Sequence, residues 1–494
     1  MKAYIFLFWL LLNLYCPNLF GQYSLVLSEP LKDAYRDISS LRIKSGENKL
    51  SLIKLEDPQN AMISYIENYA DFFTLFIQED ATKYKILLKN RDIRLKRIKA
   101  SDTNSPYYLF CQAEIILQWA TIKLKFDDKI GAANDVYTAY KLLEKNKQKY
   151  PDFVENNKSL SIIHALAESV PGWIRKIMGI KGSVNLGTKE ISLLAEKAKQ
   201  SNSIFKEEIV AIYSYILFYS NNRKEEAYLL FDKYKLDHRK NPLITFLKAT
   251  MANKIGKNDT AIRILEERPK GLDYLPFYYL DFMYGKFKLS KLDKDADMHI
   301  NKFLKHFKGK HYIKEAYQKL GWYHIVVNGD IPAYKNNMRD CIEKGQSLID
   351  EDIQAAREAK SGQIPNEILL KARLLYDGGY YTKCQSLLIL HGDSFAKAIH
   401  DGEYYYRMAR VTEALKNYVD AIDFYKLTII KSDPGKYYGC NAALQLGLIY
   451  ELQKNYKGAE TYFDKCLDLD PAGYSSSLHQ KAKSGLDRIK KELD

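Results

Sequence analysis

Small side chains recur at a nearly constant interval through the C-terminal half of the chain. Successive members lie 34 to 38 residues apart, except before Cys384, where the interval is 51 residues. The series consists of Ala227, Ala261, Ala296, Ala333, Cys384, Ala421 and Ala459. A period of this length is typical of units of two helices, which cannot bury their apolar faces alone and must stack on neighbours.

The clearest unit covers residues 440–471, in which two short helical patterns are joined at Lys454-Asn455. Gly447 and Ala459 stand where the two helices must touch, and large side chains fill the positions between them. The stretch 416–426, KNYVDAIDFYK, nearly repeats KNYKGAETYFDK of the last unit. The pattern resembles the tetratricopeptide repeat (TPR), a helix–turn–helix unit of about 34 residues.

We therefore predict an all-α fold: an α-solenoid of TPR-like helix pairs, coiled as a right-handed superhelix with a concave groove, preceded by a helical N-terminal region. Eight helix pairs can be counted. The predicted parts are an N-terminal region (23–205) with one TPR-like pair, central repeats (206–345), and C-terminal repeats with a capping helix (346–494). The long interval before Cys384 predicts an additional helix at 346–360, and 474–494 predicts the cap.

The N-terminal region departs from the repeat pattern. We expect loops around Ser45-Gly46 and Asp57-Pro58 and a strongly apolar helix from Ala61 to Ile77. Residues 83–99 carry eight basic residues against one acid, with apolar residues on one face. Such a helix either lies on an anionic surface or forms an outer solenoid helix with a solvated face, and we favour the second interpretation.

An insert at residues 170–187 does not fit a TPR. Its glycine trio, Gly179, Gly182 and Gly187, follows a Pro-containing apolar stretch, as in the tetratricopeptide-repeat-protein-39 and inclusion-body-clearance family, which the segment resembles. The chain has Ile180 and Ser183 where that family favours an aromatic residue and an acid. The resemblance implies a helical-repeat scaffold without known catalysis and no particular partner.

The physical role expected for these glycines is tight turns and close helix packing. They lack the order of a phosphate-binding loop, and no strand pattern precedes them. Trp173 and Met178 of the same insert are expected to fill a core.

The first 22 residues resemble a secretory signal peptide. A positive start, Met1-Lys2, precedes the apolar run Ala3 to Leu12 and the small residue Gly21. We expect cleavage near Gly21 or Gln22 and no stable membrane span afterwards; the alternative is an uncleaved anchor, although the run is short for one. Because Tyr15 precedes Cys16, a lipoprotein signal is not indicated. The predicted location is exported, in the periplasm or cell envelope of a bacterium.

Motifs for chemistry are weak. The five remaining cysteines have no CxxC spacing, which indicates buried thiols and neither a disulfide framework nor a zinc site. His299, His306 and His311 have no carboxylates at the spacing of a metal site, so we expect them at the surface. The run from His391 to Ser394 brings base, acid and hydroxyl together but lacks the nucleophile elbow, so we expect a loop. We predict no catalytic residues, no metal, no cofactor and no enzyme.

The formal net charge of +14 is spread over the whole chain. Base-reading motifs and alternating basic–aromatic strands are missing, so nucleic acid is not the predicted partner. Composition leaves the oligomeric state open.

One constellation predicts a binding surface. In TPR arrays certain positions of each first helix face the groove, and these fall at Arg373, Tyr376, Tyr406, Arg407, Arg410 and Asn441. Arg373 and Arg410 hold equivalent places in adjacent units. Guanidinium groups grip carboxylates with two parallel hydrogen bonds, so the hypothesis is a groove for an acidic or C-terminal peptide. The favoured alternative is local pairing of Arg407 and Arg410 with Glu403 and Glu413 at helical spacing.

The sequence thus predicts an exported, non-catalytic scaffold that binds another protein or peptide. The alternative is a SusD-like envelope protein that binds a glycan or small ligand. The 39 tyrosines of the chain are interpreted first as packing between helices. Tyrosine clusters such as Tyr107-Tyr108, Tyr278-Tyr279 and Tyr404 to Tyr406 could stack on sugars. Exposed coplanar tyrosines would favour the glycan, and buried ones the scaffold.

Overall fold

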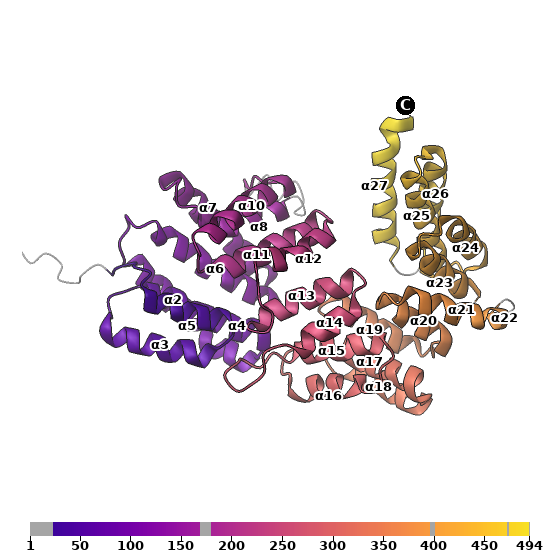
Figure 1. The fold of residues 1–494 in the computed structure, drawn as a ribbon, viewed down its shortest axis with the longest axis horizontal. Helices are drawn as coiled ribbons and strands as arrows, with labels where there is room; N and C mark the ends of the chain where they lie inside the picture. The colour runs from indigo at the N-terminus through magenta and orange to yellow at the C-terminus, as the bar shows by residue number, and fades with distance from the viewer. Residues whose placement is uncertain (1–22, 168–178, 396–400, 472–473, 494) are drawn as a thin grey trace, which may run out of the picture. The chain divides into compact units, whose positions relative to one another are not determined.

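The structure is a computed structural model that describes residues 23–167, 179–395, 401–471 and 474–493. Within these ranges the chain is all-α, and outside helices it has only isolated β-bridges, Tyr23–Ser101 and Ser24–Asn60. The helices follow one another as tightly packed consecutive pairs (Figure 1), which confirms the predicted α-solenoid class. The right-handed superhelix stays a prediction. The predicted signal peptide, Trp173 and Met178 lie outside the described residues.

Contacts divide the chain into two compact units. Unit 1 contains the described residues of Met1–Ala252 with Arg263–Leu280 and His306–Gly309, and unit 2 contains Asn253–Ile262, Asp281–Lys305 and the described residues of Lys310–Asp494. The helices of unit 1 are α2 (Glu29–Ser39), α3 (Ile43–Glu56), α4 (Met62–Gln78), α5 (Ala81–Lys99), α6 (Tyr107–Lys125), α7 (Lys129–Lys149), α8 (Asn156–Leu166), α10 (Val184–Gln200), α11 (Lys206–Tyr215), the π-helix η2 (Ile216–Ser220) and α12 (Lys224–Lys233).

Four helices contribute residues to both units: α13 (Pro242–Lys254), α14 (Asn258–Glu266), α15 (Tyr279–Ser290) and α16 (Ala296–His306). The remaining helices belong to unit 2: α17 (Ile313–Tyr323), the π-helix η3 (His324–Asn328), α18 (Ile331–Glu343), α19 (Asp350–Ser361), α20 (Glu367–Asp377), α21 (Tyr381–Leu390), α22 (Gly392–Phe395), α23 (Asp401–Ala414), α24 (Tyr418–Lys431), α25 (Tyr437–Leu452), α26 (Tyr456–Asp468) and α27 (Ser475–Leu493).

One turn geometry recurs between the two helices of each pair. A residue with positive φ lies within four residues of the start of the second helix in all eight predicted pairs, at Asp127, Asn222, Gly256, Leu292, Gly329, Gly379, Lys416 and Lys454. In six pairs it directly precedes the cap residue, whereas Leu292 lies four residues before Ala296, where α16 begins. Several of the cap residues, including Asn417 and Asn455, then accept a hydrogen bond from an amide three residues later. Leu41 before α3 and Glu79 before α5 also have positive φ, so α2/α3 and α4/α5 use the same turn. These N-terminal pairs were not evident from the sequence.

The periodic small residues lie at the helix contacts, with one exception. Ala227, Ala261, Ala296, Cys384, Ala421 and Ala459 are all buried. Ala333 is only half-buried, and Tyr334 occupies the contact position in its place. Tyr334 fits because Gly321 on α17 has no side chain, and a Cβ there would lie 3.1 Å from the tyrosine ring. The predicted register was wrong by one residue at this pair.

The expected loop at Ser45-Gly46 was also wrong. Both residues lie inside α3, and Gly46 is the small residue at the crossing with α2. A Cβ on Gly46 would lie 3.0 Å from the carbonyl oxygen of Ala34. Glycine here allows two backbones to approach, which is the role that alanine has in later pairs.

The glycines of the insert have the predicted roles. Gly179 has a φ of +62° in a turn. A Cβ on Gly182 would lie 2.6 Å from the Cα of His164 on α8, and a Cβ on Gly187 would overlap the carbonyl oxygen of Ser161. The insert therefore sets α10 directly on the backbone of α8.

Two arginines of helix α5 form ion pairs inside unit 1. Arg94 is buried and its guanidinium lies 2.6 Å from the Asp71 carboxylate, while Arg91 lies 2.9 Å from Asp135. The lysines of the helix are largely exposed. Nowhere in the described ranges does a helix combine the length and the apolar composition that a bilayer span requires.

Unit 2 contains helices at the two places where the sequence predicts an additional helix and a cap. The additional helix exists as α19, and its Asp352 accepts hydrogen bonds from the amides of Tyr312 and Glu315 at 2.7 and 3.0 Å, which caps α17. The cap helix α27 packs along α25 and α26 (Figure 1), and its Arg488 binds Glu451 through two hydrogen bonds of 2.7 Å.

Candidate functional site

Helix α23 borders two surface hollows in unit 2, and the six predicted groove residues line them. The first, which we call the Arg410 hollow, has a volume of about 260 Å³ and is lined by Tyr376, Tyr406, Arg410 and Asn441. The second, the Arg407 hollow, has a volume of about 510 Å³ and is lined by Arg373 and Arg407 together with Trp322, Glu403 and Tyr438. Arg373 and Arg410 thus line different hollows.

Arg407 is held by its own helix. Its Nε donates to the Glu403 carboxylate at 2.9 Å and a terminal nitrogen binds the same oxygen. Although burial alone would raise it, the pKa of Glu403 is lowered by this guanidinium. The predicted local pairing is therefore confirmed for Arg407, whose charge is already neutralised.

Arg410 differs from its neighbour. Its guanidinium carbon lies 4.0 Å from the centre of the Tyr376 ring and 5.7 Å from that of Tyr406. The predicted partner Glu413 instead accepts a hydrogen bond from the Tyr425 hydroxyl at 2.6 Å. Among the residues that the structure describes, no carboxylate lies within 4 Å of Arg410. Local pairing was therefore the wrong prediction for Arg410.

The wall opposite Arg410 presents neutral polar groups. Asn441 on α25 donates to the hydroxyl of Tyr406 at 2.8 Å and accepts from Gln445 at 3.0 Å. Glu413, which lies on α23 beside Arg410, is the acid among the lining residues, and burial raises its pKa. The Arg410 hollow is a polar site with a half-buried cation on which Asp377 and Glu413 act only from beyond 4 Å, and it is suited to a carboxylate.

Trp322 on α17 is a buried residue at the base of the Arg407 hollow that the sequence did not indicate. The guanidinium carbon of Arg373 lies 4.5 Å from its ring centre, and the Lys319 amine lies 3.6 Å from it. Arg373 reaches an acid only at 3.9 Å, at Asp377, and its side chain is 41% exposed. It therefore has hydrogen-bond donors available to a ligand.

Lys319 predicts a pH dependence of stability. Burial lowers its pKa to about 8 against the attraction of Glu315, and Arg373 and Lys286 lower it further. Between about pH 8 and about 10.5 the unfolded chain binds more protons than the folded one, so the free energy of unfolding rises with pH. We expect a rise of a few kcal/mol across this window, absent in Lys319→Met, which is more stable than the parent at neutral pH.

Urea unfolding followed by far-UV circular dichroism at several pH values measures this effect. The difference between the parent and Lys319→Met isolates the lysine from other titrating groups. Parallel stability profiles of the two proteins would contradict the assignment.

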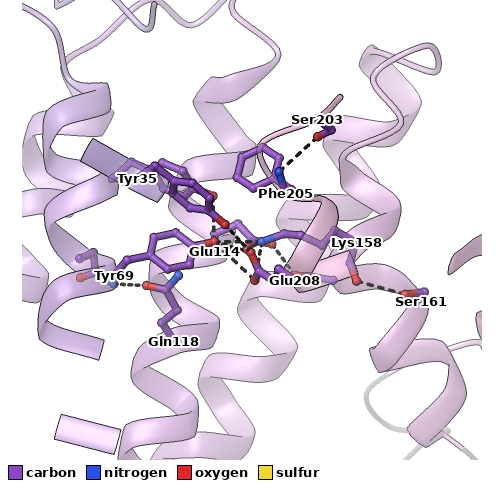
Figure 2. Close-up of polar contacts among 12 residues, drawn as sticks. Tyr35, Tyr69, Glu114, Gln118, Lys158, Ser161, Ser203, Phe205 and Glu208 are labelled. Carbon is purple, nitrogen blue, oxygen red and sulfur yellow. Dashed lines mark hydrogen bonds and ion pairs between the residues drawn. The ribbon is translucent and has the colours of Figure 1, made fainter. Parts of the chain in front are cut away.

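A second cluster lies in unit 1 around the buried Lys158 (Figure 2). The Lys158 amine on α8 donates to Glu114 at 2.5 Å, to Glu208 at 2.8 Å and to the Tyr69 hydroxyl at 3.0 Å. The Tyr35 hydroxyl donates to Glu208 at 3.0 Å. One lysine thus connects α2, α4, α6, α8 and α11.

This Lys158 cluster is an internal anchor. Lys158 is 0% exposed and Glu114 is 3% exposed, so a ligand has no access to either charge. Burial opposes the charge of Lys158, but Glu114 and Glu208 together keep its pKa above the ordinary value. Burial raises the pKa of Glu114 itself. No sequence pattern indicated this cluster, because its members come from helices far apart in the chain.

The remaining candidates for chemistry lie as follows. His306 is exposed and His299 half-buried, but His311 is 5% exposed, so its predicted surface position was wrong. In the described part of the chain, no group of three or more potential ligands is placed to hold a metal ion. Residues Gly392–Phe395 form the one-turn helix α22 rather than a loop, and the Ser394 hydroxyl donates to the His391 carbonyl at 2.7 Å.

The tyrosine clusters are packed against other rings. Tyr404 stacks on Phe395 with ring centres 5.3 Å apart and an interplanar angle of 15°. Tyr107 meets Phe153 edge-on at 5.0 Å, and Tyr278 stacks on His306 at 5.3 Å. All members are buried or half-buried.

Neither a scan against protein-family models nor a search of curated protein sequences returns a match to this chain. The class of molecule is defined by its structure alone. It is an all-α protein of stacked helix pairs, with two hollows in unit 2 that are lined by arginine and aromatic residues.

Proposed function

We propose that this protein is an exported, TPR-like scaffold that binds an acidic segment of another protein at the Arg410 hollow and has no catalytic activity. The observation that carries the proposal is Arg410: a half-buried guanidinium stacked on Tyr376, with no acid within 4 Å among the described residues. A cation held in this way attracts a carboxylate from outside the chain.

The aromatic neighbours support this role. Because Tyr376 and Tyr406 hold the guanidinium over their rings, little side-chain freedom is lost when a ligand binds. The planar group presents its N–H donors in a fixed geometry that matches a carboxylate. Arg373, stacked on Trp322, is a second anchor for a segment that extends from one hollow to the other.

Two further parts of the proposal concern identity and location. The repeated turn and the buried small residues support membership of the TPR class, with a segment order similar to that of the tetratricopeptide-repeat-protein-39 and inclusion-body-clearance family. The first 22 residues support export to a bacterial periplasm or envelope. Mass spectrometry of the mature chain tests the second part, since a start near Gln22 is expected and an intact Met1 would contradict it.

The glycan-binding alternative is less well supported. Sugar-binding tyrosines offer open ring faces, whereas the clusters at Tyr107, Tyr278 and Tyr404 pack on neighbouring rings.

Binding of labelled oligoglutamate and oligoglutamine peptides, measured by fluorescence anisotropy, tests the groove. We expect the glutamate peptide to bind and Arg410→Ala to weaken it by roughly 10- to 100-fold, because a charge-assisted hydrogen-bonded pair contributes about 1.5–3 kcal/mol. Arg373→Ala in addition should weaken it further. Lys426→Ala removes a largely exposed cation on α24 and is the matched control.

Two results would overturn the proposal. One is equal binding of the glutamate and glutamine peptides by the parent protein. The other is unchanged glutamate binding by the Arg373→Ala/Arg410→Ala double variant with an unaltered circular dichroism spectrum.

A further inference from the structure

Two thiols meet in the last helix pair. The Sγ atoms of Cys440 on α25 and Cys466 on α26 lie 3.6 Å apart, which is van der Waals contact. Both side chains are buried. A disulfide has an S–S length of about 2.05 Å, so the sulfurs must approach by only about 1.5 Å. Small side-chain rotations in two adjacent helices supply a movement of this size.

The other described cysteines have no such neighbour. Cys111 contacts the sulfur of Met62 at 3.7 Å, Cys341 donates to the Lys314 carbonyl at 3.3 Å, and Cys384 donates to the Ala372 carbonyl at 3.2 Å. They occupy helix contacts as small apolar residues do. The pairing of Cys440 with Cys466 is therefore specific to the last helix pair.

The two thiols are also chemically unequal. The hydrogen bond between the two thiols lowers the pKa of Cys440 against the effect of burial, and His479 on α27 lowers it further. The same interaction, together with burial, raises the pKa of Cys466. These directions favour Cys440 as the attacking thiol.

We propose that Cys440 and Cys466 are a dithiol–disulfide pair whose oxidation joins α25 to α26 covalently. The oxidant is a disulfide, either a small molecule such as oxidised glutathione or a thiol–disulfide oxidase. The Cys440 thiolate attacks one of its sulfurs and releases the first thiol. Cys466 then loses its proton and attacks the Cys440 sulfur of the mixed disulfide, which releases the second thiol. Overall, two protein thiols become one disulfide and one external disulfide becomes two thiols.

Access to this pair is controlled by α27. Leu478, Ala482 and Ile489 of this helix belong to the same apolar cluster as the two cysteines. Helix α27 packs on α25 and α26 with one face and exposes the other to solvent, so it opens at lower free energy than the helices that it covers. Oxidation should therefore follow the opening of α27 and not global unfolding. This inference is independent of the peptide groove.

Full-length protein incubated with oxidised glutathione, then denatured and alkylated, tests the pair. We expect loss of two alkylatable thiols and one disulfide-linked peptide pair that contains Cys440 and Cys466. Cys384→Ala is the matched control and should leave this product unchanged. Cys440→Ala should abolish it, and Cys466→Ala should stop at the glutathione adduct of Cys440.

The α27 gate has a separate readout. Arg488→Ala removes the two hydrogen bonds to Glu451 and should speed oxidation severalfold without changing the product. The proposal is overturned if Cys440 and Cys466 both remain alkylatable under conditions that oxidise the urea-unfolded chain, or if they carry only glutathione. If the rate of disulfide formation is unchanged in Arg488→Ala and equals the rate of global unfolding, α27 does not control access to the two thiols.

Discussion

Replacing Lys158 by methionine is expected to lower the free energy of unfolding by about 3–5 kcal/mol, because removal of one partner leaves a buried charge without compensation. Glu114 would keep only Ser159 as a close donor, in a site where it is 3% exposed. Tyr69 would lose the hydrogen bond that its hydroxyl accepts from the lysine. Unfolding in urea, followed by circular dichroism, measures the loss.

The sign of the pH dependence identifies the cause. Burial already raises the pKa of Glu114, and loss of Lys158 raises it further. In the variant the folded state then binds more protons than the unfolded state, so its stability falls as pH rises above the ordinary pKa of a glutamate, about 4.3. The gap between parent and variant should therefore widen from acid to neutral pH. A gap that stays constant with pH would indicate lost packing instead.

Two companion variants complete the experiment. Lys158→Met combined with Glu114→Gln removes both charges and should recover most of the loss, since a buried ion pair is replaceable by neutral groups. Lys233→Met breaks a pair with Glu196 in which both side chains are about half exposed, and it should cost below about 1 kcal/mol. Equal losses in Lys158→Met and Lys233→Met would contradict the role of Lys158 as an internal anchor.

The sequence predicted the repeats because small residues are visible wherever two helices must touch. Ala261, Ala421 and Ala459 lie where the pattern placed them. The same reasoning failed at Ala333, since a gap on the partner helix at Gly321 lets Tyr334 fill the contact. Which of two contacting helices has the large side chain depends on the residues of both helices. The spacing of small residues along one helix does not reveal it.

The N-terminal pairs show the same limit. Gly46 was interpreted as a turn residue, because glycine is common in loops, whereas it allows α3 to cross close to α2. No period linked it to the later alanines. Only the positive φ at Leu41, four residues before Ser45, relates this pair to the others.

For the candidate site, the sequence indicated the positions but not the state of each side chain. Arg407 and Arg410 both have an acid at helical spacing, yet only Arg407 is paired with its acid. The Glu413 carboxylate instead accepts a hydrogen bond from the hydroxyl of Tyr425, which lies on the next helix. Trp322 and the Lys158 cluster depend on contacts between distant segments, so local spacing carried no signal for them.

The second large effect is expected at Gly187, where alanine should destabilise the protein by about 3 kcal/mol. The added Cβ would overlap the carbonyl oxygen of Ser161 and lie 2.8 Å from the amide nitrogen of Ala165. Both are backbone atoms of α8, so α8 and α10 must move apart. The loss of stability should therefore lie at the upper end of the range that is usual for overpacked cores. Far-UV circular dichroism during urea unfolding measures the change.

Gly179 supplies a control within the same segment. It has a φ of +62°, and a Cβ added there would have no atom of the described residues within 4 Å, so Gly179→Ala carries backbone strain of about 1 kcal/mol without a clash. Adding Ala165→Gly to Gly187→Ala removes the Ala165 Cβ contact but not the backbone overlap, so only partial recovery is expected. Because the backbone clash exists at Gly187 and not at Gly179, equal losses at the two positions would mean that α8 and α10 are not in backbone contact.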